Sequence, residues 1–272
     1  MRDEQLTAVS FYIVAHADDW QLFMQPNVYN DIVASGKKVV FIITTAGDAG
    51  VGETFWSARE EGLKSSIRFC VCPREVATES TAIKVFNEHP LNCWSLNNVT
   101  SYFLRLPDGN LDGSGFPANN YHSLTRFKSQ EIHYITAVDN STGYANWHDF
   151  HTILEAIILN ESDGISNIGV HYLDPDSDSN PGDHKDHAAT GEAIQEMTTI
   201  STLRQTLYMG YSVGGRNSNL DPSNLFWKTG MFAAYEKAVY DLCGYSTLKE
   251  GISTYMKWCL AAAHSVTINP QV

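Results

Sequence analysis

The sequence of 272 residues lacks the features that would place it in a membrane or outside the cell. It contains no run of about 18 apolar residues, so we expect no membrane-spanning helix and no membrane anchor. The first residues lack the basic start and the uninterrupted apolar core of a signal peptide. The five cysteines are odd in number and show no CxxC spacing, which favours reduced thiols. These absences predict a cytoplasmic protein.

Positive charge is also scarce. The chain has 18 Lys and Arg residues against 31 Asp and Glu residues, a formal net charge of −13. This balance opposes binding to nucleic-acid backbones and to anionic membranes. The glycines of "GDAGVGE" (47–53) do not follow the G-x-G-x-x-G spacing of dinucleotide-binding proteins. We therefore expect a small-molecule partner and no nucleic acid.

Strand and helix signals alternate through the first third of the chain. Short runs of apolar and β-branched residues predict strands at 9–14 and 37–47. Helical spacing of apolar residues predicts helices at 27–35 and 53–69. This β-α-β-α order predicts an α/β fold with a parallel sheet and crossover helices.

The remaining chain resumes this alternation after a less regular middle. Residues 80–145 are rich in Asn, Ser, Gly and Pro, which is typical of loops. Later patterns predict strands at 165–173 and 203–213 and helices at 147–159, 186–197, 226–241 and 247–262. Because no linker separates these blocks, we predict a single domain over residues 1–272, with weaker patterns from about 200 to 272.

Polar segments follow three of the predicted strands. His16, Asp18 and Asp19 come directly after the first strand, and the loop "TTAGDAGVGE" (44–53) follows the second. The segment "PGDHKDHAATGEA" (181–193) follows a late strand and opens a helix. Ligands of parallel α/β sheets collect at the carboxyl ends of the strands, so we expect these segments to converge.

The residue types in these segments suit a catalytic zinc ion. Such an ion takes three protein ligands and keeps one position open for water. His16, Asp19 and one histidine of "HKDH" (184–187) can supply the three ligands. Asp18 would then remain free to act as a general base. Fe(II), Co(II) or Mn(II) could use the same ligands.

Simpler interpretations of single polar residues stay open. Asp183 or Asp186 could cap the helix that follows them. His148 and His151 lie three residues apart on a predicted helix and could bind a metal, although an ordinary pair on one helix face is the simpler interpretation. His171 lies on a predicted strand, where we expect a packing role.

The sequence resembles the PIG-L/LmbE-like N-acetylglucosaminyl deacetylases. "AHADDW" (15–20) is similar to the AHPDDE signature of that family, and "HKDH" (184–187) is similar to its HPDH signature. The loop 44–53 and "AREE" (58–61) also resemble the family's Thr-Gly loop and Arg-bearing helix. The resemblance covers about residues 9–200. It implies a three-layer, Rossmann-like α/β fold with a mainly parallel sheet and helices on both faces.

The resemblance implies a role for each residue of the two signatures. His16, Asp19 and His187 would bind zinc. Asp18 would be the general base and would later return a proton to the leaving amine. A protonated His184 would help to stabilise the oxyanion, and Asp186 would hold the orientation of His184 through a hydrogen bond.

Other positions either extend the resemblance or depart from it. Arg59 falls where the family often has a substrate-contacting arginine, and Asp108 would line the pocket or form a simple turn. In the first signature, Ala17 stands in place of the usual Pro and Trp20 in place of the usual Glu. In the second signature, Lys185 stands in place of the usual Pro. Trp20 could stack on a sugar ring at the pocket mouth or could belong to the core.

The function implied is that of a zinc-dependent hydrolase. It would remove an acetyl or other acyl group from the amino group of an N-acylated amino sugar or glycoconjugate. One alternative is a metal-dependent amidase acting on a non-sugar natural product. Another is a catalytically silent carbohydrate- or metabolite-binding protein of the same fold, which Trp20 would favour. The acyl group, the sugar and the oligomeric state stay open.

Overall fold

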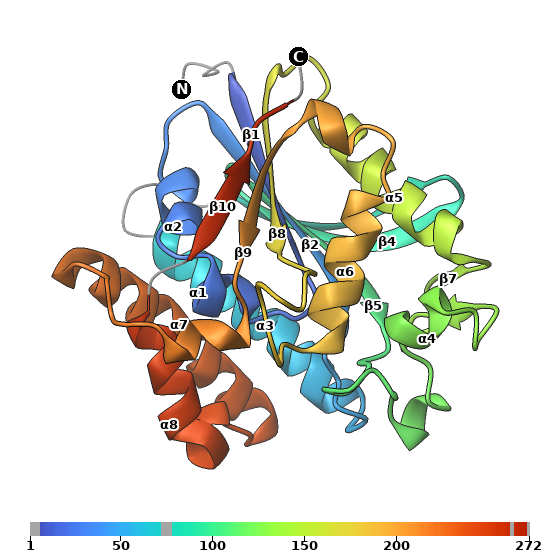
Figure 1. Ribbon diagram of the computed structural model, residues 1–272. Coiled ribbons are helices and arrows are strands. Elements are labelled where there is room, and N and C mark those ends of the chain that lie inside the picture. The colour runs from blue at the N-terminus through green and yellow to red at the C-terminus, as the bar shows by residue number, and fades with distance from the viewer. Residues whose placement is uncertain (1–5, 72–77, 262–263, 271–272) are drawn as a thin grey trace.

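A single large sheet runs through the middle of the protein, as Figure 1 shows for the computed structural model, which describes residues 6–71, 78–261 and 264–270. Its strands are β1 (Ala8–Val14), β2 (Lys37–Thr45), β3 (Glu79–Phe86), β4 (His89–Leu96), β5 (Val99–Leu106), β8 (Asn167–Leu173), β9 (Arg204–Tyr208) and β10 (Ser265–Ile268). Their order is β10-β9-β8-β1-β2-β5-β4-β3. The five strands from β9 to β5 are parallel to one another, and the outer strands on both sides are antiparallel. A separate small ribbon joins β6 (Ile135–Thr136) to β7 (Gly143–Tyr144).

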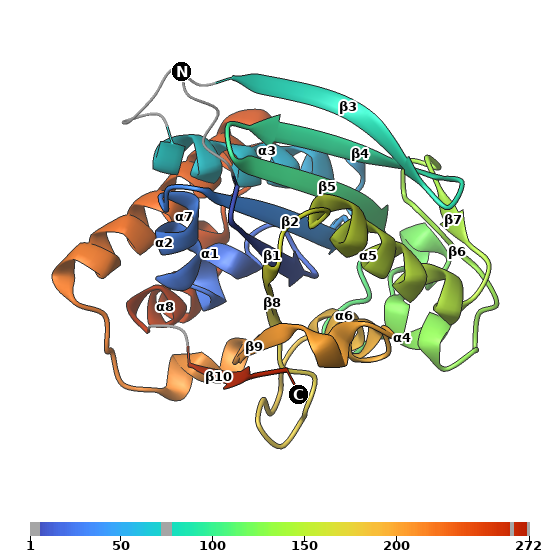
Figure 2. The same ribbon diagram turned by 90° about the horizontal axis from the view of Figure 1, so that it is seen from above.

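Helices cover both faces of this sheet, which Figure 2 shows from above. They are α1 (Asp19–Phe23), α2 (Asn27–Ile32), α3 (Glu53–Val71), α4 (Leu124–Lys128), α5 (Trp147–Glu161), α6 (Lys185–Gln195), α7 (Pro222–Cys243) and α8 (Thr247–Leu260). Side chains of α1, α2, α3, α7 and α8 pack in one hydrophobic core, and those of α4, α5 and α6 pack in the other. The predicted three-layer, Rossmann-like α/β architecture with a mainly parallel sheet is confirmed.

The composition of β1 explains its central place. Every residue of this strand is buried, and its apolar and β-branched side chains suit a strand covered on both faces. Successive side chains point to opposite faces. Tyr12 and Val14 therefore contribute to the core beneath α3 and α7, whereas Phe11 and Ile13 contribute to the core beneath α5 and α6.

The prediction of irregular loops across residues 80–145 is wrong for its first part. Residues 79–106 form three antiparallel strands, β3, β4 and β5. Asn87 and Glu88 both have positive φ, 44° and 71°, in the turn between β3 and β4. Two-residue turns of this kind join adjacent strands, so asparagines that suggested a loop mark a hairpin instead. β3 is an edge strand with mostly exposed side chains, and its apolar residues Ile83 and Val85, which alternate with Lys84, face solvent and not a core.

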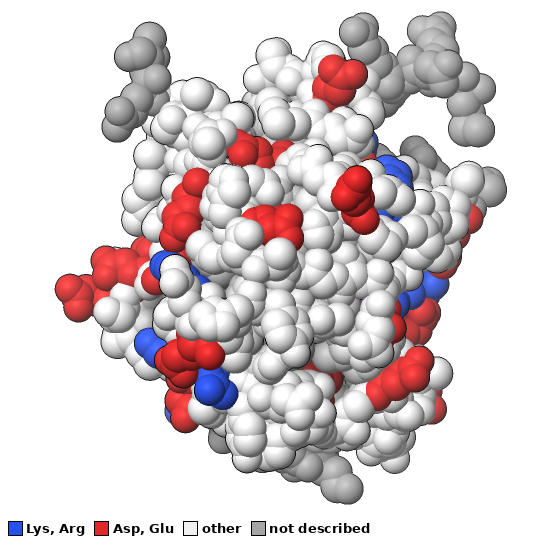
Figure 3. Space-filling model, turned by 90° about the vertical axis from the view of Figure 1, so that its right-hand side faces the viewer, with Lys and Arg blue, Asp and Glu red and all other residues white. Residues whose placement is uncertain are grey.

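The surface agrees with the acidic composition. On the face in Figure 3, Asp and Glu side chains are spread more widely than Lys and Arg side chains. Among the described helices, none has both the length and the apolar character that a membrane span requires. The cytoplasmic location stays a prediction.

A buried lysine fixes the two predicted C-terminal helices, which are present as α7 and α8. Lys228 of α7 has no exposed surface. Its Nζ donates hydrogen bonds to the carbonyl oxygens of Leu22 (2.7 Å), Trp258 (2.6 Å) and Ala261 (2.6 Å). Burial lowers the pKa of Lys228 to about 8. This one side chain thus ties the end of α1, next to the first polar motif, to the end of α8.

We expect Lys228→Met to destabilise the protein by about 3 kcal/mol, because methionine fills the space but leaves three buried carbonyl groups without their donor. The free energy of unfolding in urea measures this loss. Lys237→Met is the matched control, since Lys237 lies on the exposed side of the same helix and its ion pair with Asp241 is open to solvent. Equal stability of the two variants would contradict the anchoring role of Lys228.

Candidate active site

Three side chains from distant parts of the chain meet beyond the carboxyl end of β1. The distance from His16 Nδ1 to His187 Nε2 is 3.2 Å, and the distance from His187 Nε2 to Asp19 Oδ1 is 3.1 Å. His16 Nδ1 lies 3.5 Å from the same Asp19 oxygen. A tetrahedral zinc ion with bonds of about 2.0–2.2 Å keeps its ligands about 3.3–3.6 Å apart. The three atoms therefore fit the coordination shell of such an ion.

A second set of contacts aims these atoms at one another. His16 Nε2 lies 3.4 Å from Asp186 Oδ2, and His187 Nδ1 lies 2.9 Å from Asp183 Oδ1. The other oxygen of Asp19 accepts the backbone N–H of His16 at 2.8 Å. Each imidazole thus has one nitrogen facing a carboxylate and the other free to bind a cation. Carboxylates placed behind metal-binding histidines in this way fix the tautomer and strengthen the ligand.

The electrostatics of this cluster also favour a cation. Burial opposes protonation of His16, but the charge of Asp19 and the hydrogen bonds that the ring donates to Asp186 and Asp19 raise the pKa of His16 to about 10. Burial opposes protonation of His187 as well, yet the charges of Asp183 and Asp19 raise its pKa well above the ordinary value. A field that stabilises a proton on these rings also stabilises a metal ion, which must displace that proton in order to bind.

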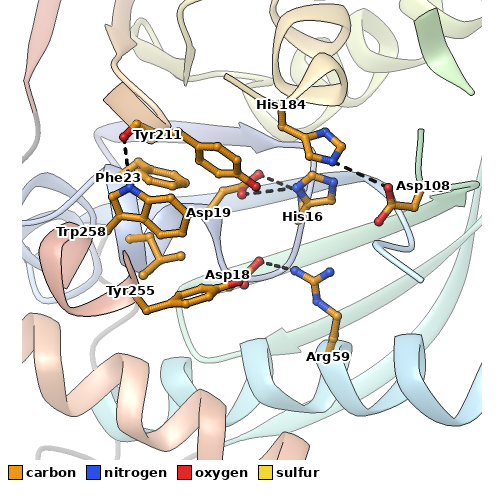
Figure 4. A pocket seen from close by; sticks show the side chains of 11 residues that line it. His16, Asp18, Asp19, Phe23, Arg59, Asp108, His184, Tyr211, Tyr255 and Trp258 are labelled. Atoms are coloured by element: carbon orange, nitrogen blue, oxygen red, sulfur yellow. Dashed lines mark hydrogen bonds and ion pairs between the residues drawn. The ribbon is translucent and has the colours of Figure 1, made fainter. Parts of the chain in front are cut away.

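Asp18 lies on the other side of the cavity, where Arg59 of α3 holds it (Figure 4). Arg59 Nη2 donates to Asp18 Oδ1. The same guanidinium donates from Nη1 to the carbonyl of Gly47 at 2.7 Å and from Nε to the hydroxyl of Tyr235 at 2.8 Å. Gly47 has φ +56°, and a Cβ there would collide with the guanidinium. Arg59 is therefore fixed and orients Asp18; its predicted contact with substrate stays a prediction.

His184 is the residue that caps α6 and lines the same cavity. Its Nδ1 accepts the backbone N–H of Asp186 at 3.1 Å, which leaves the ring proton on Nε2, 3.8 Å from Asp108 Oδ1. Burial and the charge of His16 lower the pKa of His184 to about 4 in the metal-free protein, which favours a neutral ring at pH 7; the protonated ring that the resemblance implies stays a prediction. The carboxylate of Asp186 contacts His16 and accepts the backbone N–H of Gly109 at 2.8 Å.

An aromatic wall, formed by Tyr211, Tyr255, Trp258 and Phe23, closes one side of the cavity (Figure 4). The rings of Tyr211 and Trp258 stack with centroids 4.5 Å apart, and Trp258 Nε1 donates to the Tyr211 carbonyl. The cavity has a volume of about 110 Å³. These four residues carry no motif, and three of them lie beyond residue 200, so sequence reasoning missed them.

Trp20 does not belong to this wall. It has no exposed surface and packs in the core against Phe41, with ring centroids 5.0 Å apart. The predicted stacking of Trp20 on a sugar ring is thus corrected in favour of the alternative core position. The physical reason is that Trp20 lies in α1, on the side that faces the sheet.

The structure also decides which residue caps α6 and whether His148 and His151 belong to a metal-binding group. The side chain that caps α6 is that of His184, and not that of Asp183 or Asp186. Within the described residues, the groups able to hold a metal ion all include His16, and neither His148 nor His151 belongs to them. Asp183 is the site residue that the sequence analysis assigned only to capping, although its spacing of four residues from His187 on a helix start was a usable signal.

A comparison with known families agrees with this geometry. Residues 11–198 match the family model PIG-L, described as GlcNAc-PI de-N-acetylase. The chain belongs to the PIG-L family. The matched range of this PIG-L protein contains both polar motifs and Arg59, whereas α7 and α8, with most of the aromatic wall, lie outside it. No curated protein sequence matches the chain significantly.

Solved structures share the fold at low sequence identity. A deacetylase of the teicoplanin biosynthesis pathway has a TM-score of 0.50 at 13% identity, over 86% of this chain and 85% of that one. N,N'-diacetylchitobiose deacetylase from Pyrococcus horikoshii has a TM-score of 0.45 at 14% identity, over 86% and 73%. The 4-carboxy-2-hydroxymuconate hydratase GalB from Pseudomonas putida has a TM-score of 0.43 at 10% identity, over 98% of both chains. The first likeness supports the fold alone.

We expect the purified protein to contain about one equivalent of divalent metal per chain and His187→Ala to contain almost none, because the variant keeps only two of the three ligand atoms. Plasma mass spectrometry after dialysis measures this content. His148→Ala is the control, since it also removes a histidine but leaves the cluster intact. Retention of the metal by His187→Ala would show that the ion binds elsewhere.

The affinity for zinc should increase with pH. His16 and His187 have raised pKa values in the metal-free protein, so at least one proton occupies the site at pH 7 and must leave when zinc binds. We expect affinity to rise about tenfold per pH unit for each proton displaced, between about pH 5.5 and 7.5. Competition with a chelator of known affinity measures it, and a pH-independent constant would contradict the protonated free site.

Proposed function

We propose that this PIG-L protein is a zinc-dependent amide hydrolase. It removes an acetyl or other acyl group from the amino group of an N-acylated amino sugar or glycoconjugate. The observation that carries the proposal is the pairing of two features in one cavity. His16, Asp19 and His187 offer three convergent ligand atoms, and Asp18 lines the same cavity as His16 and Asp19 but stays outside the ligand set. Membership of a family described as a de-N-acetylase supports the same reaction class.

Zinc held by these ligands would supply a Lewis acid that polarises the amide carbonyl and makes water acidic near neutral pH. Asp18 supplies the base. Its carboxylate is 5% exposed and lines the cavity, and the ion pair with Arg59 fixes one of its oxygens. The other oxygen can take a proton from the attacking water and return it to the leaving amine. A protein that only binds sugars has no need of such a base, which disfavours the silent alternative.

His184 supplies a hydrogen-bond donor for the oxyanion. Because its Nδ1 already accepts the Asp186 amide, Nε2–H points toward the cavity even though the ring is neutral. Donors that are fixed before the reaction stabilise developing negative charge without reorganisation. Asp108, 3.8 Å from Nε2, keeps the ring oriented and supports the proton on that nitrogen.

The shape and lining of the cavity favour a small acyl group on a polar substrate. Its volume of about 110 Å³ leaves room for an acetyl group near the ligand atoms. Asp108 and Arg59 line the polar side of the cavity. Tyr255 and Trp258 on the opposite side provide aromatic faces, which pack well against the apolar face of a sugar ring.

We expect Asp18→Asn to lower kcat by at least about 100-fold while the metal content stays near that of the wild type. The asparagine keeps the size of the side chain and a hydrogen bond to Arg59 but does not accept a proton. Turnover is measured on N-acetylglucosamine, N,N'-diacetylchitobiose and N-acetylated amines that lack a sugar.

Asp163→Asn is the control, because Asp163 is an exposed carboxylate remote from the cavity. Full turnover of Asp18→Asn on every substrate that the wild type hydrolyses would refute the role of Asp18. Activity of the wild type on the amines alone would replace the amino-sugar substrate by a non-sugar amide.

A further inference from the structure

A second cavity, of about 320 Å³, lies at the opposite edge of the sheet from the active site. It is bounded by α2 and by strands β8, β9 and β10, which are grouped on one side of Figure 1. Lys37 and Arg204, which line it, are the first residues of the parallel strands β2 and β9, whereas His16 lies two residues beyond the last residue of β1. The two cavities share no lining residue.

The wall of this second cavity contains a buried histidine with one unused nitrogen. His171 of β8 is 6% exposed, stacks on Tyr12 with centroids 4.3 Å apart, and has no hydrogen-bond partner at Nε2. Its Nδ1 lies 2.8 Å from the Tyr208 hydroxyl, which itself accepts a hydrogen bond from Asn27 Nδ2 at 2.9 Å. The sequence analysis expected packing alone for His171, and stacking accounts for only part of its environment.

The hydrogen-bond chain decides which nitrogen of His171 carries the proton. The Tyr208 hydroxyl accepts from Asn27, and among the described residues its own proton has no acceptor other than His171 Nδ1, so Tyr208 donates that proton to Nδ1. Burial lowers the pKa of His171 to about 3, so the ring is neutral and its single proton lies on Nε2. His171 therefore presents an N–H donor without an acceptor. Buried donors of this kind normally have a partner.

A cation lies beside this donor. The position that a Cβ on Gly169 would occupy is 3.1 Å from Arg204 Nη2 and 3.2 Å from His171 Nε2, so the absence of a side chain at Gly169 keeps a space between the two groups. Lys37 in the same cavity is neutralised by its ion pair with Asp31. Within the described residues, Arg204 makes no ion pair. In a chain of net charge −13, the cavity wall thus carries one uncompensated positive charge.

We propose that this cavity binds a small organic anion whose carboxylate or phosphate group accepts hydrogen bonds from Arg204 and from His171 Nε2. Both donors line the same cavity and lie close to Gly169, so one anionic group can reach both of them. Asn30 and the hydroxyls of Thr206 and Thr267 line the remaining space and suit the polar body of such a molecule. This binding is independent of hydrolysis at the other edge of the sheet.

The test is calorimetric titration of the metal-loaded protein with inorganic phosphate and with succinate, which separate the phosphate from the carboxylate alternative. We expect saturable millimolar or tighter binding of at least one probe. Arg204→Gln should weaken it at least tenfold, and so should Gly169→Ala, which changes no charge but fills the space between the donors. Arg216→Gln, an exposed arginine outside the cavity, is the charge-matched control and should bind as the wild type does.

The metal centre is a competing site for either anion, so His187→Ala is titrated as well. Binding that survives His187→Ala and is lost in Arg204→Gln supports the second cavity. Binding lost in His187→Ala but kept in Arg204→Gln would assign the anion to the metal centre and overturn the proposal. Equal weakening by Arg216→Gln and Arg204→Gln, or no saturable binding of either probe, would overturn it too.

Discussion

The approach of two imidazole nitrogens to within 3.2 Å inside a buried site is the constraint on which the rest of the structure depends. His16 and His187 would repel each other if both were charged. If both were neutral, with their protons on the nitrogens that face Asp186 and Asp183, two lone pairs would face each other. The carboxylate of Asp19 lies close to both nitrogens, so a cation bound among the three groups would relieve this repulsion. The contact also requires the end of β1 and the start of α6 to meet, and the parallel pairing of β1 with β8 provides this because α6 follows β8. The strand pairing that forms the centre of the sheet is therefore also what brings the two histidines together.

The carboxylates around that contact fall into two groups, which differ in the partners that hold them. Asp183 and Asp186 lie behind the histidines and leave them electron-rich, whereas Asp18 is turned to the other side by the guanidinium of Arg59. Without that ion pair, Asp18 could turn toward a metal ion held by His16, Asp19 and His187 and become a further ligand. In the proposed reaction, the oxygen of Asp18 that Arg59 does not hold exchanges protons with the attacking water. In the proposed function, Asp19 is a ligand and Asp18 is the base. This difference depends on the hydrogen bonds that each carboxylate makes and not on the residue type.

The sequence predicts the candidate ligands and base of this site better than the residues that shape its cavity. Short signatures such as "AHADDW" and "HKDH" indicate ligands and base, because backbone positions at strand ends restrict where those side chains point. The parallel strands were predictable for a similar reason, since burial on both faces forces continuous apolar runs. The edge strand β3 was missed because its short alternation of Ile83, Lys84 and Val85 lies in a segment rich in loop-forming residues. The aromatic wall was not predictable because the aromatic residues of a cavity wall have no fixed spacing. Trp20 shows the same limit: its burial follows from the orientation of α1, which the motif does not encode.

The C-terminal helices add the part of the site that the family match does not cover. Tyr235 of α7 fixes Arg59 and through it Asp18, so the proposed base is oriented by a residue well outside the two signatures. Trp258 of α8 and its neighbours form the cavity wall, and Lys228 anchors the carbonyl of Trp258 to that of Leu22 beside the first motif. Substitutions in α7 and α8 can therefore change which molecule fits the cavity while the ligands of the metal stay in place. In the proposed function, the ligands and the base lie within residues 11–198, and the packing of the last 70 or so residues against them shapes the substrate cavity.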